Sequence, residues 1–181
     1  IIGNTDESAQ KQEEYLLFLM KKQVDGFIFV PASYNVSTIL QNKKVPFVIL
    51  DRRFPSSQVD SVRCDSVTGA FNLTNHLLEL RHRRIAIITG RQDHTTACDR
   101  VEGYQLALKN ANLGDAEQIF WGEFTQEAGY ENTMRVLQIS PRPTAIFAAN
   151  NFIAIGIMRA LRDAGVRVPD DISVVTFDDL P

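Results

Sequence analysis

The chain has 181 residues, of which 44% are hydrophobic and 23% are charged, and its formal net charge is −3 at pH 7. This composition is too apolar for a disordered chain, and no apolar run approaches the roughly 20 residues that a membrane-spanning helix needs. The slightly acidic balance argues against a protein that holds nucleic acid by the charge of its whole surface. We therefore expect a globular protein of one domain or two small lobes, with no membrane partner.

The ends of the chain and its cysteines give further expectations. The sequence starts at Ile1 without a methionine or a basic leader, and it stops at Pro181, just after an apolar run. Both ends suggest a piece cut from a longer protein. The two cysteines, Cys64 and Cys98, lie outside any metal-binding or redox spacing. We expect two reduced thiols, no disulfide, no metal site and no cofactor.

Short apolar runs, typical of strands, follow one another along the chain. They predict strands over residues 26–30, 46–50, 84–89, 145–148 and 172–177. Ile1-Ile2 is expected to be the tail of another strand, and residues 61–64 a short edge strand. Because the main runs are nearly continuous in apolar residues, both faces of their strands should be covered, as in a parallel sheet.

Between these runs, apolar residues recur on one helical face. The spacing predicts helices over residues 8–23, 66–78, 96–110, 130–137 and 151–164. Gly165 and Pro169 form a stop signal for the last helix. Alternating strands and helices predict an α/β protein with parallel strands and right-handed crossovers. A turn-rich loop over residues 53–57 and a break in rhythm up to Asp65 divide it into an N-terminal lobe, 1–65, and a C-terminal lobe, 66–181.

Polar side chains follow several of the predicted strands, where open parallel sheets bind ligands. Those that we single out as candidate ligand contacts are Asp51, Arg52, Arg100, Asn150 and Asp178, while Ser33 and Tyr34 follow the first strand. Carboxylates accept hydroxyl protons, an amide both donates and accepts, and a guanidinium donates a planar fork. The set would suit a neutral polyhydroxylated ligand or a small anion. Phe124 could cover a ring of that ligand.

Each candidate also has a purely structural explanation. Asp51, Asn150 and Asp178 could cap the helices that follow them. Arg100 could pair with Asp99 or Glu102 on a solvated face. Trp121 and Phe124 could belong to the core. Their common placement at strand ends is what favours a binding site.

Motifs of catalysis are missing from the sequence. It contains no glycine-rich phosphate loop, no nucleophile elbow and no zinc-protease motif. His76 and His82 are scattered, and His82 lies in a basic run that is best explained as a solvated helix end. His94 follows Asp93, so a catalytic dyad of these two residues is an alternative. We therefore expect a binding protein and not an enzyme.

Longer stretches resemble one family. HLLELRHRRIAIITG, DRVEGYQLAL, WGEFTQEAGYENTMRVL and the segment from PTAIFAANN to FDDLP resemble the effector-binding domain of the lactose repressor/galactose repressor (LacI/GalR) family of bacterial transcription regulators. VDGFIFVPAS and VPFVILDRR resemble it too, so the resemblance covers essentially the whole chain. It implies the two-lobed fold of periplasmic sugar-binding proteins, with both lobes incomplete here and the effector bound in the cleft between them.

The resemblance also implies a cytoplasmic repressor that acts as a homodimer. A helix-turn-helix headpiece outside this chain would read operator DNA. A sugar or sugar derivative in the cleft would shift the arrangement of the lobes and so change the operator affinity. An exported sugar-binding receptor of a transporter is the alternative on the same fold, and an α/β enzyme acting on a sugar or nucleotide is a third.

The positions that match the family's effector contacts in the C-terminal lobe are Arg100, Phe124, Asn150 and Asp178. In the N-terminal lobe, Asp51 and Arg52 match a position that faces the cleft. The chain departs from the family at Arg81, where a glycine suited to the left-handed conformation is usual. It departs again at Asn151, where an aspartate is usual.

Overall fold

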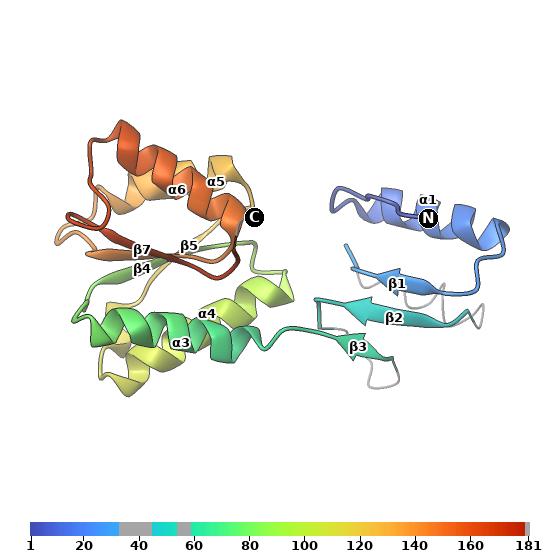
Figure 1. The fold of residues 1–181 in the computed structure, drawn as a ribbon, viewed down its shortest axis with the longest axis horizontal. Helices are drawn as coiled ribbons and strands as arrows, with labels where there is room; N and C mark the ends of the chain where they lie inside the picture. The colour runs from blue at the N-terminus through green and yellow to red at the C-terminus, as the bar shows by residue number, and fades with distance from the viewer. Residues whose placement is uncertain (33–44, 54–58, 180–181) are drawn as a thin grey trace. The chain divides into compact units, whose positions relative to one another are not determined.

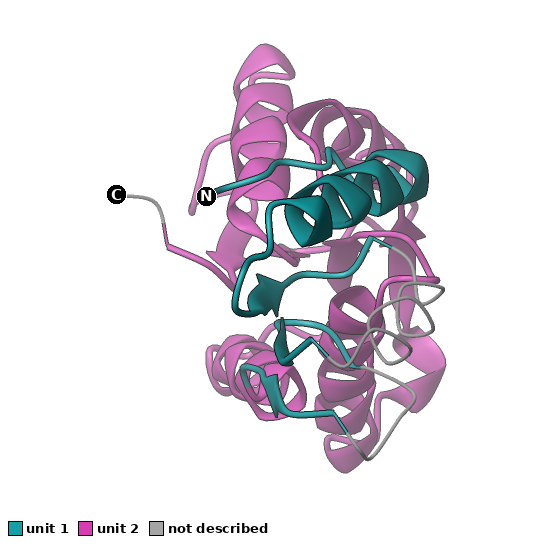
Figure 2. Ribbon diagram, turned by 90° about the vertical axis from the view of Figure 1, so that its right-hand side faces the viewer, with its two compact units in different colours: residues 1–64 teal, residues 65–181 magenta. Residues whose placement is uncertain are grey.

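The chain divides into two compact units, Ile1–Cys64 and Asp65–Pro181 (Figures 1 and 2). The computed structural model describes residues 1–32, 45–53 and 59–179. Ser33, Tyr34 and most of the predicted turn-rich loop lie outside the described residues. Over the described part, no helix is both long and apolar enough to cross a membrane.

Unit 1 combines one described helix with a three-stranded parallel sheet. Its elements are α1 (Ala9–Lys21), β1 (Phe27–Phe29), β2 (Phe47–Leu50) and β3 (Ser61–Val62), with the strand order β1-β2-β3. Leu16 of α1 packs with Phe29 and Ile49 in a small core. The prediction of a short edge strand at β3 is confirmed. The strand predicted at Ile1-Ile2 is wrong: these residues are 93% and 99% exposed, and they pair with no strand among the described residues.

Unit 2 is a three-layer α/β sandwich (Figure 1). In chain order it contains α3 (Ser66–Glu79), β4 (Ile85–Thr89), α4 (Thr95–Asn110), the 3₁₀ helix η1 (Gly114–Ala116), β5 (Gln118–Trp121), α5 (Gln126–Val136), β6 (Ala145–Ala148), α6 (Asn151–Asp163) and β7 (Ser173–Thr176). The strands form a parallel sheet in the order β5-β4-β6-β7. Strand β5 was not among the predicted strands; it is an edge strand and only half-buried.

Helices cover both faces of this sheet, which explains its continuous apolar runs. Ile85 and Ile87 of β4 pack in the same cluster as Tyr104 of α4, together with residues of α3. Ala86 and Ile88 face the other way, into the cluster formed with α5 and α6. Every residue of β4 is therefore buried, as expected for an interior parallel strand.

The turn after α3 keeps its left-handed residue although no glycine is present. Arg81 has φ +70°, its N–H donates to Leu78 O, and the N–H of His82 donates to Leu77 O. These two bonds make a Schellman cap. The same pattern ends α6 at Gly165, where φ is +67°. The departure from glycine at Arg81 therefore leaves the turn formed.

Candidate functional site

The carboxyl ends of the unit 2 strands bring the predicted side chains together around Arg100. This arginine lies in α4 and is only 7% exposed, so it is not on a solvated face. Its Nη1 donates to the carbonyl oxygen of Ala149, 2.5 Å away, and lies 3.6 Å from Oδ2 of Asp178. One guanidinium thus links the end of β6 to the end of β7.

Two phenylalanine rings surround the same guanidinium. The Cζ of Arg100 lies 4.0 Å from the ring centroid of Phe177 and 5.8 Å from that of Phe124. Contacts of this kind with the face of an aromatic ring favour a cation. A Cβ added at Gly90 would lie 2.4 Å from the Phe124 ring, so that ring sits against bare backbone at the end of β4. Phe124 is therefore part of the strand-end cluster, and it is half-buried and also packs against the core cluster that includes residues of α5 and α6.

Asn150 caps α6, which is the structural role that the sequence analysis gives as the alternative to ligand binding. Its Oδ1 accepts a hydrogen bond of 2.9 Å from the N–H of Ile153. Its Nδ2 makes no hydrogen bond within the described part of the chain. Capping therefore uses one half of the amide and leaves the donor half for another partner.

His94 and Phe177 belong to this cluster, although neither was among the ligand contacts expected from the sequence. The His94 ring stacks on Phe124 with 6.1 Å between centroids and 26° between planes, and its side chain is only 12% exposed. It stands at the N-cap position of α4, with no side-chain cap bond. The signals that could have found them are positional. His94 lies in the loop after a strand, and Phe177 directly precedes Asp178.

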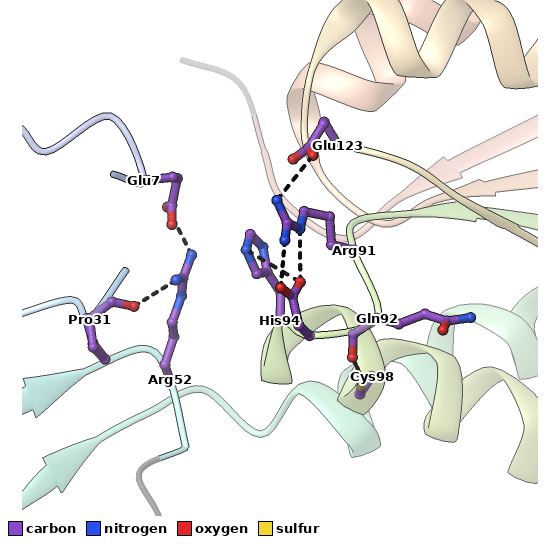
Figure 3. A network of polar contacts seen from close by, with 9 residues as sticks. Glu7, Pro31, Arg52, Arg91, Gln92, His94, Cys98 and Glu123 are labelled. Atoms are coloured by element: carbon purple, nitrogen blue, oxygen red, sulfur yellow. Dashed lines mark hydrogen bonds and ion pairs between the residues drawn. The ribbon is translucent and has the colours of Figure 1, made fainter. Parts of the chain in front are cut away.

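An ion-pair network ties two of the strand-end loops together (Figure 3). Arg91 donates to both carboxylate oxygens of Asp93, at 2.9 and 2.6 Å, and its Nη1 lies 3.6 Å from Glu123. The hydrogen bonds from Arg91 lower the pKa of the Asp93 carboxyl. All three side chains are more than half exposed, so the network orients loops without adding much stability.

The two remaining candidates, Asp51 and Arg52, stand at the carboxyl end of β2 in unit 1. Asp51 is exposed and has φ +69°. Arg52 is buried: its Nη1 donates to Pro31 O at 2.6 Å and its Nη2 to Glu7 Oε1 at 2.8 Å (Figure 3). Within unit 1 the guanidinium is therefore committed to neighbouring loops, whereas the Asp51 carboxylate forms no hydrogen bond or ion pair in the described part of the chain.

Chemically, the unit 2 cluster combines groups that can bind a polar ligand. It offers a half-exposed carboxylate, an amide donor and apolar rings, which suit a hydroxylated ring. In the described ranges, no group of three or more His, Cys, Asp or Glu residues could hold a metal ion.

Comparisons with known proteins give a consistent result. The family of periplasmic binding protein-like domains matches residues 74–181. The HTH-type transcriptional repressor PurR of Aliivibrio fischeri is 36% identical over 183 residues, which cover 98% of this chain and 54% of that repressor. This chain therefore spans about half the length of the curated relatives that it matches.

Solved structures resemble the fold closely. The transcription regulator CcpA of Lactococcus lactis matches with a TM-score of 0.88 and 29% identity, covering 97% of this chain and 65% of that one. A LacI family transcriptional regulator from Enterococcus faecium, solved with bound ribose, matches with a TM-score of 0.81 and 30% identity, covering 90% of this chain and 62% of that one.

Proposed function

This chain belongs to the periplasmic binding protein-like domain family, in its LacI/GalR branch, and on that premise we propose that it is the effector-binding part of a DNA-binding transcriptional repressor. The relatives are named as repressors and transcription regulators. These names favour a repressor over an exported receptor of a transporter, and also over an enzyme.

The proposed effector is a small polyhydroxylated molecule, a sugar or a sugar derivative. The single observation that supports it is the convergence on Arg100 of three strand ends: Ala149 after β6, Asp178 after β7 and Phe124 after β5. A carboxylate held beside a fixed cation accepts hydroxyl protons in strong, charge-assisted hydrogen bonds. The ribose bound to the Enterococcus faecium regulator supports the same class of ligand.

We assign the roles as follows. Asp178 accepts ligand hydroxyl protons, the Nδ2 of Asn150 donates to a ligand oxygen, and Phe124 packs on an apolar face of the ring. Arg100 orients Asp178 and contributes positive charge. In unit 1, Asp51 is the proposed acceptor of ligand hydroxyl protons, and Arg52 stands beside it.

The proposed mechanism is a shift of population between two states of the repressor. An effector that binds one arrangement of the lobes more tightly favours that arrangement. A homodimer would pass the change to headpieces outside this chain that hold operator DNA, and such a repressor would act in the cytoplasm. No step of this mechanism needs a cofactor.

Isothermal titration calorimetry on the complete protein tests the proposal, first with ribose and then with other sugars, sugar phosphates and nucleobases. Asp178→Asn removes the charged acceptor without changing the shape of the side chain. Because a hydrogen bond to a charged group contributes about 1.5–3 kcal/mol, the variant should bind about 10- to 100-fold more weakly. Asp115→Asn, on the exposed η1 helix, is the matched control. Absence of saturable binding by every compound, or equal affinity in the two variants, would contradict the proposal.

A further inference from the structure

We propose that Arg52 is a positioning residue: it holds Asp51 in a left-handed turn, so that the Asp51 carboxylate, and not the Arg52 guanidinium, meets the ligand. This inference deepens the proposed function and rests on it. It assigns different roles to Asp51 and Arg52, which the sequence analysis names together as candidate ligand contacts.

The first observation is the backbone at the end of β2. The N–H of Arg52 donates to Leu50 O at 2.8 Å, which closes a three-residue turn around Asp51 at φ +69°. A γ-turn with a positive φ at its centre is rare and strained. The N–H of Asp51 donates to Val62 O of the neighbouring β3 at 2.8 Å. Strain of this kind persists only where surrounding contacts fix it, and it gathers at ligand sites.

The second observation is what fixes the turn. The Arg52 side chain is 8% exposed and spans two other segments, bonding to the carbonyl of Pro31 after β1 and to the carboxylate of Glu7 before α1. Its Nε is buried and has no hydrogen-bond acceptor in the described part of the chain. The bonds to Pro31 and Glu7 use two of the five N–H groups of the guanidinium and hold the side chain against the protein.

The third observation is that the two segments held by Arg52 are themselves constrained. Glu7 has φ +58° and follows Asp6 at φ +48°, just before the α1 N-cap. The loop after β1 has a second anchor, since the N–H of Ala32 donates to Oε1 of the fully buried Gln12. Arg52 therefore joins these two segments to the turn that carries the exposed Asp51.

A double-mutant cycle on ribose affinity, measured by calorimetry on the complete protein, tests this. Asp51→Ala and Arg52→Met should each weaken binding, and the double variant should bind no more weakly than Asp51→Ala alone. Glu7→Ala, which removes one anchor, should weaken binding only while Asp51 is present. If the effects of Asp51→Ala and Arg52→Met multiply, Arg52 contacts the ligand itself and the inference is wrong. It is also wrong if Arg52→Met binds as tightly as the wild type.

A second measurement needs no ligand, so it decides the inference even if the complete protein binds no sugar. In NMR spectra, Arg52→Met should speed hydrogen exchange of the amide at position 52 and shift the HN–Hα coupling of Asp51 toward an extended backbone. Amides of α3 to α6 should not change. Lys21→Met, which removes an exposed cation from the same unit, is the control. An Asp51 coupling that is unchanged by Arg52→Met overturns the inference, whereas failure of ribose and every other compound to bind overturns the proposed function alone.

Discussion

The guanidinium carbon of Arg100 lies 4.0 Å from the ring centroid of Phe177, while its Nη1 donates to the backbone carbonyl of Ala149. The arginine that the family resemblance assigns to the effector is thus already part of the fold of unit 2. Together with the proposed role in binding, this structural role predicts two separable defects when Arg100 is replaced, one in stability and one in binding.

Arg100→Met tests the structural half. The substitution keeps an apolar stem of similar length but removes a buried hydrogen bond from a charged donor and two cation–π contacts. We expect a loss of about 2–3 kcal/mol in the free energy of unfolding, measured by urea denaturation. Arg162→Met provides the control because the Arg162 side chain is 74% exposed and pairs with its neighbour Asp163. Equal losses of unfolding free energy in the two variants would show that the buried contacts of Arg100 do not stabilise the fold.

Asn150 offers a cleaner separation of stability from binding. Asn150→Asp keeps an oxygen that accepts from the Ile153 N–H but removes the Nδ2 donor. Its stability should match the wild type, while its affinity for the sugar should fall. Asn150→Ala loses both functions and should cost about 1 kcal/mol of stability as well. If Asn150→Asp bound the sugar as tightly as the wild type, Asn150 would be a helix cap and nothing more.

Gly156 sets how closely α6 approaches α5. A Cβ at this position would lie 2.1 Å from Gln126 O and 2.8 Å from the N of Tyr130, both rigid helix backbone. Gly156→Ala should therefore destabilise unit 2 by about 1–3 kcal/mol, even though alanine is the better helix former. Nothing lies within 4 Å of a Cβ built on Gly114, so Gly114→Ala should stay within about 0.5 kcal/mol of the wild type. Thermal unfolding of both variants measures the difference.

The sequence predicts the helix positions well because their ends carry local signals. Ser8, Asp65 and Asn150 each cap the helix that follows them by accepting a backbone hydrogen bond. Strands carry no comparable signals at their ends, and the two places where the strand predictions differ from the structure have a physical cause. Ile1-Ile2 has strand-forming residues but no neighbour to pair with among those described, and β5 is only half-buried at a sheet edge. A segment forms a strand only when another strand pairs with it, and that partner can lie far away in the sequence.

In the candidate site, too, some features could be predicted from the sequence and others could not. The parallel direction of the strands follows from the alternation of elements, so the placement of Asn150 and Asp178 at strand ends is predictable. The contact of His94 with Phe124 depends on the path of two loops, and no spacing in the sequence encodes it. Arg52 shows the limit most clearly. Its residue type suits a ligand contact, yet the path of two other segments turns its side chain toward Pro31 and Glu7.

Arg81 holds a left-handed conformation that a glycine adopts at no steric cost. Because the strain is about 1 kcal/mol for a residue with a Cβ, Arg81→Gly should raise the free energy of unfolding by up to about that amount. Arg81→Ala keeps the Cβ and should bring no such gain. Denaturant titration of both variants is the measurement. A gain in the alanine variant equal to that of the glycine variant would point to the side-chain charge and not to the backbone.

His82 should make the stability of unit 2 depend on pH. Its Nδ1 lies 2.9 Å from Oγ1 of Thr144 in a partly buried setting, and burial lowers the pKa of the ring. The unfolded chain therefore binds a proton more readily than the folded one. The stability that this difference confers is present above the unfolded pKa of about 6.5 and is lost as the pH falls toward the folded value.

Urea titrations of the wild type and His82→Gln between pH 8 and pH 5 measure this contribution directly. The variant lacks the titrating ring, so the gap in free energy of unfolding between the two proteins should be widest above pH 7 and should narrow toward pH 5. Taking the difference between the two proteins cancels the titration of their common groups. A gap that stays constant would mean that folding leaves the pKa of His82 unchanged. A gap that widens as the solution becomes more acidic would mean that the folded protein favours the protonated form of His82. In that case the contact with Thr144, and not burial, would control the ring.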